Sequence, residues 1–224
     1  MKGLILIKDS TLSKVDELIE RYSALEICRK DLTNAVKIIC ECFRKGNKLL
    51  TCGNGGSAAD SQHIVGELMK GFLLKRPIKT FDKEFYENLK LTYPDDENYF
   101  SDNLQCVLPA ISLIGETALT TAFANDNSSD LIFAQQVYGL GTDNDVLLAI
   151  TTSGNSVNVL NAVKVAKLKN LKIIALTGRT GGKIKQFADV AICAPADSAY
   201  TIQEYHLPIY HMLCIAAEHE FFEI

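Results

Sequence analysis

The chain of 224 residues is 47% hydrophobic, which is enough to bury the core of one α/β domain. A net charge of −4 gives it no basic surface, so we expect no direct nucleic-acid partner. Its apolar runs are no longer than strands, which excludes a transmembrane helix, and the run at residues 4–7 is too short for a signal peptide. We therefore expect a soluble, cytoplasmic protein without membrane contacts.

The cysteines favour a reducing compartment. There are seven, an odd number, and no two form a CxxC pair. Most lie in apolar, periodic stretches. We interpret them as small core residues and not as a disulfide framework or a thiolate zinc site.

Two helices and a strand are expected before the first functional motif. Residues 11–22 and 32–44 have helical spacing, and residues 48–52 form a short apolar run. In the second helix the apolar side chains share one stripe, which consists of Leu32, Val36, Ile39, Cys40 and Phe43.

A glycine-rich turn at residues 53–56 joins that strand to a helix expected over residues 58–69. The turn reads Gly-Asn-Gly-Gly, and Ser57 occupies the expected N-cap. The glycines let the backbone approach a ligand closely, and the free N–H groups at a helix N-terminus attract an anion. This turn is therefore a candidate phosphate site, which the Ser57 hydroxyl could complete.

His63 and Glu67 lie four residues apart on the same helix, so both side chains project from one face. A pair with this spacing is more often a solvated pair than a metal site. A glycine-rich turn alone is also weak, because this one fits neither the dinucleotide fingerprint nor the Walker pattern. Their adjacency favours a functional site over either structural alternative.

Residues 79–105 differ in composition from the rest of the chain. They are rich in charged and aromatic side chains, with an acidic cluster at residues 95–97 after Pro94. We interpret them as an inserted excursion, helical around residues 81–91, that lies over the surface or over a site entrance.

The remainder alternates strands with helices. Strands are expected at residues 108–114, 145–150, 172–177 and 188–194, and helices at 116–124 and 157–169. This alternation predicts a single α/β domain over residues 1–224, with a parallel sheet and helices on both faces. The hydroxyl-rich loop Thr151-Thr152-Ser153-Gly154-Asn155-Ser156 then lies at the same sheet edge as the glycine-rich turn, where ligands bind in such sheets.

The last helix is expected over residues 200–222. Pro208 predicts a kink, or a helix that begins near it. Gln203 and His211 lie along it, together with His206, interpreted as a core or interface residue, and His219, interpreted as a surface residue.

Three motifs occur in a recognisable order: GNGGSAADSQH at residues 53–63, TTSGNS at 151–156, and IQEYH followed by a histidine at 202–211. In these the chain resembles the sugar isomerase (SIS) domain proteins, and among them the phosphoheptose isomerases. The resemblance implies a flavodoxin-like, three-layer fold. It also implies interconversion of sedoheptulose 7-phosphate and D-glycero-D-manno-heptose 7-phosphate through an enediol, by a homotetramer with sites at subunit interfaces.

The resemblance also implies roles for particular residues. The catalytic pair falls on Glu67 and His211, and one zinc ion per site falls on His63, Glu67, Gln203 and His211. The substrate and phosphate contacts fall on Asn54, Gly55, Gly56, Ser57, Asp126, Thr151, Thr152, Ser153, Ser156 and Gln203.

These roles suit the chemistry. A carboxylate can remove the carbon-bound proton, a histidine can move the oxygen-bound proton, and a cation would polarise the carbonyl. Gln203 and His211 are eight residues apart, about 12 Å along a straight helix, so shared ligation requires side-chain reach, a kink or different subunits. Tyr200 replaces an aspartate that is common in the family, and Gly71, beside Lys70, replaces a common arginine.

Two alternatives remain open. One is a non-catalytic SIS adaptor of the type that binds the bacterial replication initiator, and the other is a sugar-phosphate sensor. His63, Glu67 and His211 favour the enzyme, because an adaptor has no need of this set of side chains.

Overall fold

The computed structural model describes residues 7–224. Most of the apolar run at residues 4–7 lies outside this range. Within it, no helix combines the length and apolar character needed to cross a membrane.

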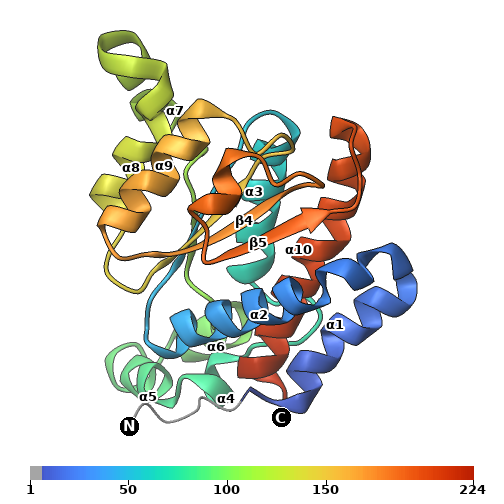
Figure 1. Ribbon diagram of the computed structural model, residues 1–224. Helices are drawn as coiled ribbons and strands as arrows, with labels where there is room; N and C mark the ends of the chain where they lie inside the picture. The colour runs from blue at the N-terminus through green and yellow to red at the C-terminus, as the bar shows by residue number, and fades with distance from the viewer. Residues whose placement is uncertain (1–6) are drawn as a thin grey trace, which may run out of the picture.

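A five-stranded parallel sheet forms the centre of the molecule (Figure 1). Its strands have the order β2-β1-β3-β4-β5. They are β1 (Leu49–Cys52), β2 (Ala110–Ser112), β3 (Val146–Ile150), β4 (Lys172–Gly178) and β5 (Val190–Ala194). This confirms the expected fold class. The order reverses between β1 and β3, and the carboxyl ends of two such strands form the usual ligand crevice of a doubly wound sheet.

Helices cover both faces of the sheet. The first face packs on α2 (Arg29–Arg44), α3 (Gly56–Leu68) and α10 (Ala199–Phe222), and α1 (Asp9–Arg21) packs against α2 and α10. The second face packs on α8 (Ile132–Leu140) and α9 (Val157–Leu168). Alternate residues of β3 enter the two cores, Leu148 and Ile150 on one side and Leu147 and Ala149 on the other, as the pleat requires.

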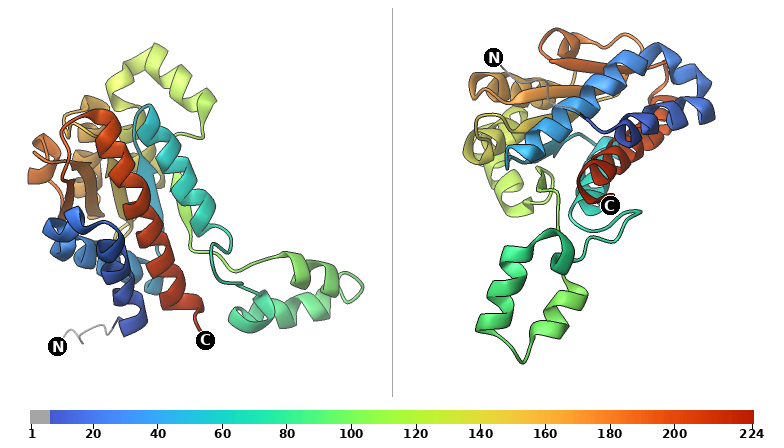
Figure 2. Two further views of the ribbon diagram at one scale, coloured as in Figure 1. Left: turned by 90° about the vertical axis from the view of Figure 1, so that its right-hand side faces the viewer. Right: turned by 90° about the horizontal axis from the view of Figure 1, so that it is seen from below.

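The excursion forms an arm of three helices, α4 (Ile78–Phe81), α5 (Lys83–Thr92) and α6 (Glu97–Asn103). Figure 2 shows that this arm reaches away from the body. Its two ends meet at an antiparallel bridge between Pro77 and Gln105. The arm leaves the body beyond the C-terminal end of α3, whereas the glycine-rich turn precedes its N-terminal end, so within one chain the arm does not lie over that turn.

Several local features differ from expectation. Helix α8 was not foreseen, and α7 (Thr117–Phe123) continues into a π-helical turn (Ala124–Ser128) and a 3-10 turn (Ser129–Leu131). Two further 3-10 turns lie at Ser23–Cys28 and Lys183–Gln186. Helix α10 is continuous from residue 199 to residue 222, so it does not begin near Pro208, which is buried inside it.

Candidate active site

Two loops meet at the carboxyl edge of the sheet. The glycine-rich turn follows β1, and the hydroxyl-rich loop follows the neighbouring strand β3. A reciprocal pair of amide hydrogen bonds, each 2.9 Å long, joins Asn54 of the first loop to Asn158 in the first turn of α9. The N-termini of α3 and α9 therefore lie side by side, and both direct free N–H groups toward the edge where an anion would bind.

Gly55 is the N-cap of α3, with a φ of 56° that favours glycine. The expectation that Ser57 is the N-cap is wrong. Ser57 is the second residue of the helix, and its backbone N–H donates to the Asn54 carbonyl at 3.0 Å. Its side chain is almost fully buried.

Internal hydrogen bonds and a close backbone contact hold the conformation of the hydroxyl-rich loop. Thr151 Oγ1 lies 3.1 Å from Ser156 Oγ, and the Ser153 hydroxyl accepts from the Asn155 N–H at 3.1 Å. Gly154 has a φ of 65°, and a Cβ there would lie 2.2 Å from the Gly181 carbonyl oxygen. This close approach fixes the loop against the turn that follows β4.

Asp126 lies apart from both loops. It is exposed in the π-helical turn after α7, where its carboxylate accepts from its neighbour Asn125 at 2.8 Å. The structure does not join it to the other candidate residues.

Helices α3 and α10 run in the same direction and contact each other along one stripe. At the start of the stripe, a Cβ on Gly56 would lie 2.5 Å from Gln203 Nε2. Seven residues further along each helix, His63 Nδ1 lies 3.0 Å from the Tyr210 hydroxyl. Gln203 therefore lies at the glycine-rich turn, while His63 lies two helical turns beyond it.

Both oxygens of the Glu67 carboxylate are hydrogen-bonded. His63 Nε2 lies 3.1 Å from Oε1, and Lys70 Nζ donates to Oε2 at 2.8 Å. Burial raises the pKa of Glu67, but the bonds from Lys70 and His63 outweigh it and hold the pKa below the usual value of 4.5. Glu67 is therefore an ionised carboxylate at neutral pH, as a general base must be.

His211 completes this cluster from α10. Its ring centroid lies 5.1 Å from that of His63, in an edge-on arrangement. Burial, followed by repulsion from His63, lowers the pKa of His211 below 6.5. His211 is thus neutral at pH 7 and able to exchange a proton. Its Nε2 is buried without a hydrogen-bond partner among the described residues.

Comparisons with known proteins identify the family of the chain. Two SIS domain profiles match residues 12–86 and 113–214. A phosphoheptose isomerase of Shewanella baltica is 37% identical over 211 residues, which is 93% of this chain and 91% of the relative. The chain belongs to the SIS domain family.

Solved structures of this family share the fold along almost the whole chain. A phosphoheptose isomerase from Francisella tularensis has a TM-score of 0.71 and 32% identity, covering 93% of this chain and 96% of its own. One from Neisseria gonorrhoeae has a TM-score of 0.70 and 32% identity, covering 94% and 97%.

The zinc ligands suggested by the SIS resemblance divide into two groups in this structure. His63, Glu67 and His211 are neighbours, and two imidazoles with a carboxylate form a donor set that suits zinc. The unpartnered His211 Nε2 also fits a ligand role. Gln203 lies instead beside Gly56. Within residues 7–224, no three His, Cys, Asp or Glu side chains are already gathered around a point that could hold a metal.

Several residues around the cluster were not foreseen from the sequence. Asp60 extends the stripe of Gly56, His63 and Glu67 at helical spacing, and burial raises its pKa against the opposing effect of the neighbouring, fully buried Tyr210. The spacing of four, three and four residues along α3 was a signal that could have identified Asp60.

Gly71 has a structural reason to depart from the family pattern. Its N–H donates to Gln105 Oε1 at 2.7 Å, and a Cβ would lie 2.6 Å from that oxygen and from the Leu74 carbonyl. An arginine does not fit at this position. The neighbouring Lys70 supplies the cation beside Glu67. Tyr200, the second departure, is exposed in the first turn of α10.

Proposed function

We propose that the protein is an aldose–ketose isomerase that interconverts sedoheptulose 7-phosphate and D-glycero-D-manno-heptose 7-phosphate. The observation that carries this proposal is that His63 contacts both Glu67 on α3 and His211 on α10, and that both helices begin at the carboxyl edge of the sheet. The 37% identity to phosphoheptose isomerases over 93% of the chain supports the choice of sugar.

In this mechanism the two loops hold the phosphate. The N-termini of α3 and α9 offer N–H groups and positive dipole ends, and hydroxyls of Thr151, Ser153 and Ser156 lie beside them. Binding there leaves the sugar to extend along α3 toward Glu67.

The distance along α3 from Ser57 to Glu67 is comparable with the length of a seven-carbon sugar phosphate. Ser57 and Glu67 are ten residues apart, about 15 Å along the axis. The Glu67 side chain points back toward the N-terminus and shortens this gap to about 10 Å. An extended seven-carbon phosphate spans about 10 Å from phosphorus to C1, so its C1 and C2 would lie near the carboxylate.

Glu67 then acts as the base. Its carboxylate removes the proton from the carbon next to the carbonyl, which gives an enediol, and returns that proton to the neighbouring carbon. His211, neutral at pH 7, moves the proton between the two oxygens. Lys70 and His63 hold the Glu67 carboxylate ionised in the resting site.

We also propose one zinc ion per site, a homotetramer and a cytoplasmic location. His63, Glu67 and His211 would hold the metal, which would polarise the substrate carbonyl when bound. Because Gln203 lies at Gly56 in its own chain, we propose that the ligating Gln203 comes from a neighbouring subunit. The seven unpaired cysteines support a reducing compartment.

The function is tested by incubating purified protein with sedoheptulose 7-phosphate and measuring the aldose product. Turnover by the parent protein and its loss in Glu67→Gln is the expected result. Binding of the sugar phosphate without turnover would favour a sensor. Neither binding nor turnover would favour the adaptor. Metal analysis of the parent and of His63→Ala, with mass measurement in solution, tests zinc and the tetramer separately.

A further inference from the structure

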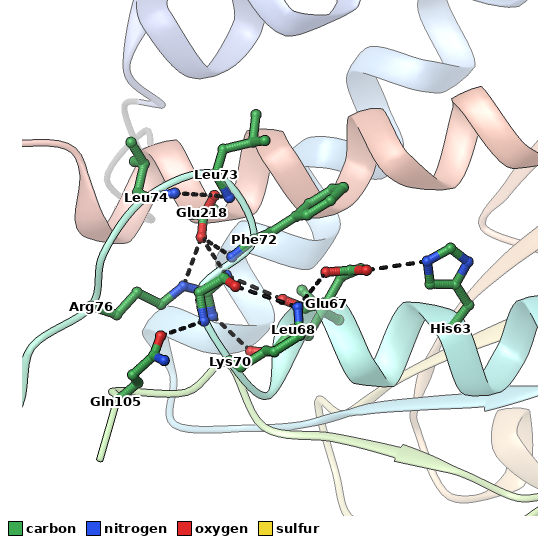
Figure 3. A network of polar contacts seen from close by, with 11 residues as sticks. His63, Glu67, Leu68, Lys70, Phe72, Leu73, Leu74, Arg76, Gln105 and Glu218 are labelled. Carbon is green, nitrogen blue, oxygen red and sulfur yellow. Dashed lines mark hydrogen bonds and ion pairs between the residues drawn. The ribbon is translucent and has the colours of Figure 1, made fainter. Parts of the chain in front are cut away.

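Arg76 and Glu218 form a fully buried ion pair at the C-terminal end of α3, next to the turn that carries Glu67 (Figure 3). Two nitrogens of the Arg76 guanidinium, Nε and Nη2, lie 2.9 Å from Glu218 Oε1. Burying two charges is costly unless every remaining polar atom finds a partner. Here the other hydrogen-bond partners of both side chains are backbone groups at the C-terminal end of α3 and in the loop that follows it.

Glu218, on α10, binds the loop that follows α3. Its carboxylate accepts from the N–H groups of Phe72 at 2.7 Å, Leu73 at 2.7 Å and Leu74 at 3.1 Å. Three consecutive amides therefore converge on one carboxylate, which fixes the path of the chain after α3.

Arg76 binds the helix itself. Its Nη1 donates to the Leu68 carbonyl at 2.7 Å, and its Nη2 lies 3.3 Å from the Glu67 carbonyl. These are among the last carbonyls of α3, which have no partner within the helix. A cation at a helix C-terminus also interacts favourably with the helix dipole.

Glu67 lies on this last turn, and an uncapped last turn frays. We propose that Arg76 and Glu218 are positioning residues, which hold the final turn of α3 so that the Glu67 carboxylate stays beside His63 and His211. This inference rests on the proposed function, in which Glu67 is the base.

The pair acts through the backbone and not through charge. The groups bonded to the Glu67 carboxylate are Lys70 and His63, and Arg76 reaches only the main chain of Glu67. Disturbing the pair should therefore lower kcat while leaving KM and the pH profile unchanged, because the phosphate loops lie at the other end of α3.

Arg76→Lys is the first test. It keeps the charge opposite Glu218 but loses the planar fork that reaches the two carbonyls. We expect kcat to fall about tenfold or more, since a small misplacement of a catalytic group has large effects. KM should stay within about twofold. Hydrogen exchange in a peptide over residues 64–75 should accelerate, while exchange in the first turn of α3 should not.

Asp145→Asn is the matched control. Asp145 is a buried carboxylate at the amino end of β3 that binds Lys48 Nζ at 2.6 Å and the Thr142 N–H at 2.8 Å, and neither partner belongs to α3 or α10. Its replacement should lower stability without changing kcat below the unfolding transition.

A double variant, Arg76→Met with Glu218→Gln, removes both charges in case the single variant does not fold. It should lose kcat in the same way. Activity within about twofold of the parent in a folded variant, or unchanged exchange over residues 64–75, would overturn the inference. An inactive parent would instead overturn the proposed function.

Discussion

His63 Nε2 lies 3.1 Å from Glu67 Oε1, one helical turn away on the same face of α3. The other oxygen of that carboxylate binds Lys70 at 2.8 Å. Glu67→Gln preserves both hydrogen-bonding positions but removes the charge. We expect turnover to fall by about 10² or more, because general-base catalysis contributes on that scale.

Solvent deuterium should also cease to enter C1 or C2 of the substrate in this variant. Glu87→Gln is the matched control, because Glu87 and Lys90 on the arm form an ion pair with the same three-residue spacing as Glu67 and Lys70. It should leave both readouts unchanged. A folded Glu67→Gln protein with normal turnover and exchange would exclude Glu67 as the base.

Gly56→Ala tests the contact between α3 and Gln203. A Cβ at this position would lie 2.5 Å from Gln203 Nε2, so the Gln203 side chain must move. Gly66→Ala adds the same methyl group to the same helix with nothing within 4 Å. Gly66→Ala should stabilise the protein by roughly 0.5–1 kcal/mol, whereas Gly56→Ala should raise KM. Equal kinetics in the two variants would show that Gln203 does not contact the substrate.

Ser153→Ala and Ser57→Ala test the phosphate site. Ser153 lies in the hydroxyl-rich loop and Ser57 in the first turn of α3, and both segments are proposed to hold the phosphate throughout the reaction, so KM should rise more than kcat falls. Ser13→Ala is the control, since its hydroxyl donates to the Ser10 carbonyl of its own helix and has no other partner among residues 7–224. A crystal soaked in sulfate provides a structural check. An anion bound elsewhere, with both loops empty, would contradict the assignment.

His206 predicts a dependence of stability on pH. It is fully buried, and burial lowers its pKa from 6.5 to about 4, so the folded protein keeps it neutral while the unfolded chain takes up a proton. Stability is therefore lost as pH falls from about 6.5 toward 4, by roughly 2 kcal/mol between pH 7 and pH 5. Urea midpoints for the parent and for His206→Gln measure this. Equal losses in the two proteins would assign the effect to other groups.

Replacing residues 79–103 by a short glycine-serine linker should leave the body folded. The bridge between Pro77 and Gln105 already brings the two ends of the arm together, so a short linker can close the gap. The thermal transition should survive in the shortened protein. Insoluble shortened protein would show that the exposed aromatic residues of the arm, such as Phe85 and Tyr99, are needed to keep the chain folded.

The sequence predicted strands most accurately where a buried apolar run ends at a turn. The strand before Gly53 and the strand before Thr151 were predicted within one residue, because each is fully buried and ends at a turn. The segment that forms α8 was not predicted. Its residues are apolar on more than one face, so they lack the alternation with polar residues that identifies a surface helix.

The candidate site was predicted only in part, for a physical reason. His63 and Glu67 share a helix, so their spacing alone places them together. Arg76 and Glu218 lie 142 residues apart in the sequence. The residues around each of them do not indicate that its charge is buried or that the two side chains form an ion pair. The N-cap was misassigned because a serine and a glycine both suit that position.

The contact of α10 with α3 bears on how the protein is made. Gln203, Tyr210, His211 and Glu218 all come from α10, which is synthesised more than 130 residues after Glu67, and α10 also packs against α1, the first described helix. Glu67 and its phosphate loops are synthesised long before these partners. A nascent chain that ends before α10 can form most of the sheet, but it lacks His211, so activity should appear only after α10 has been made.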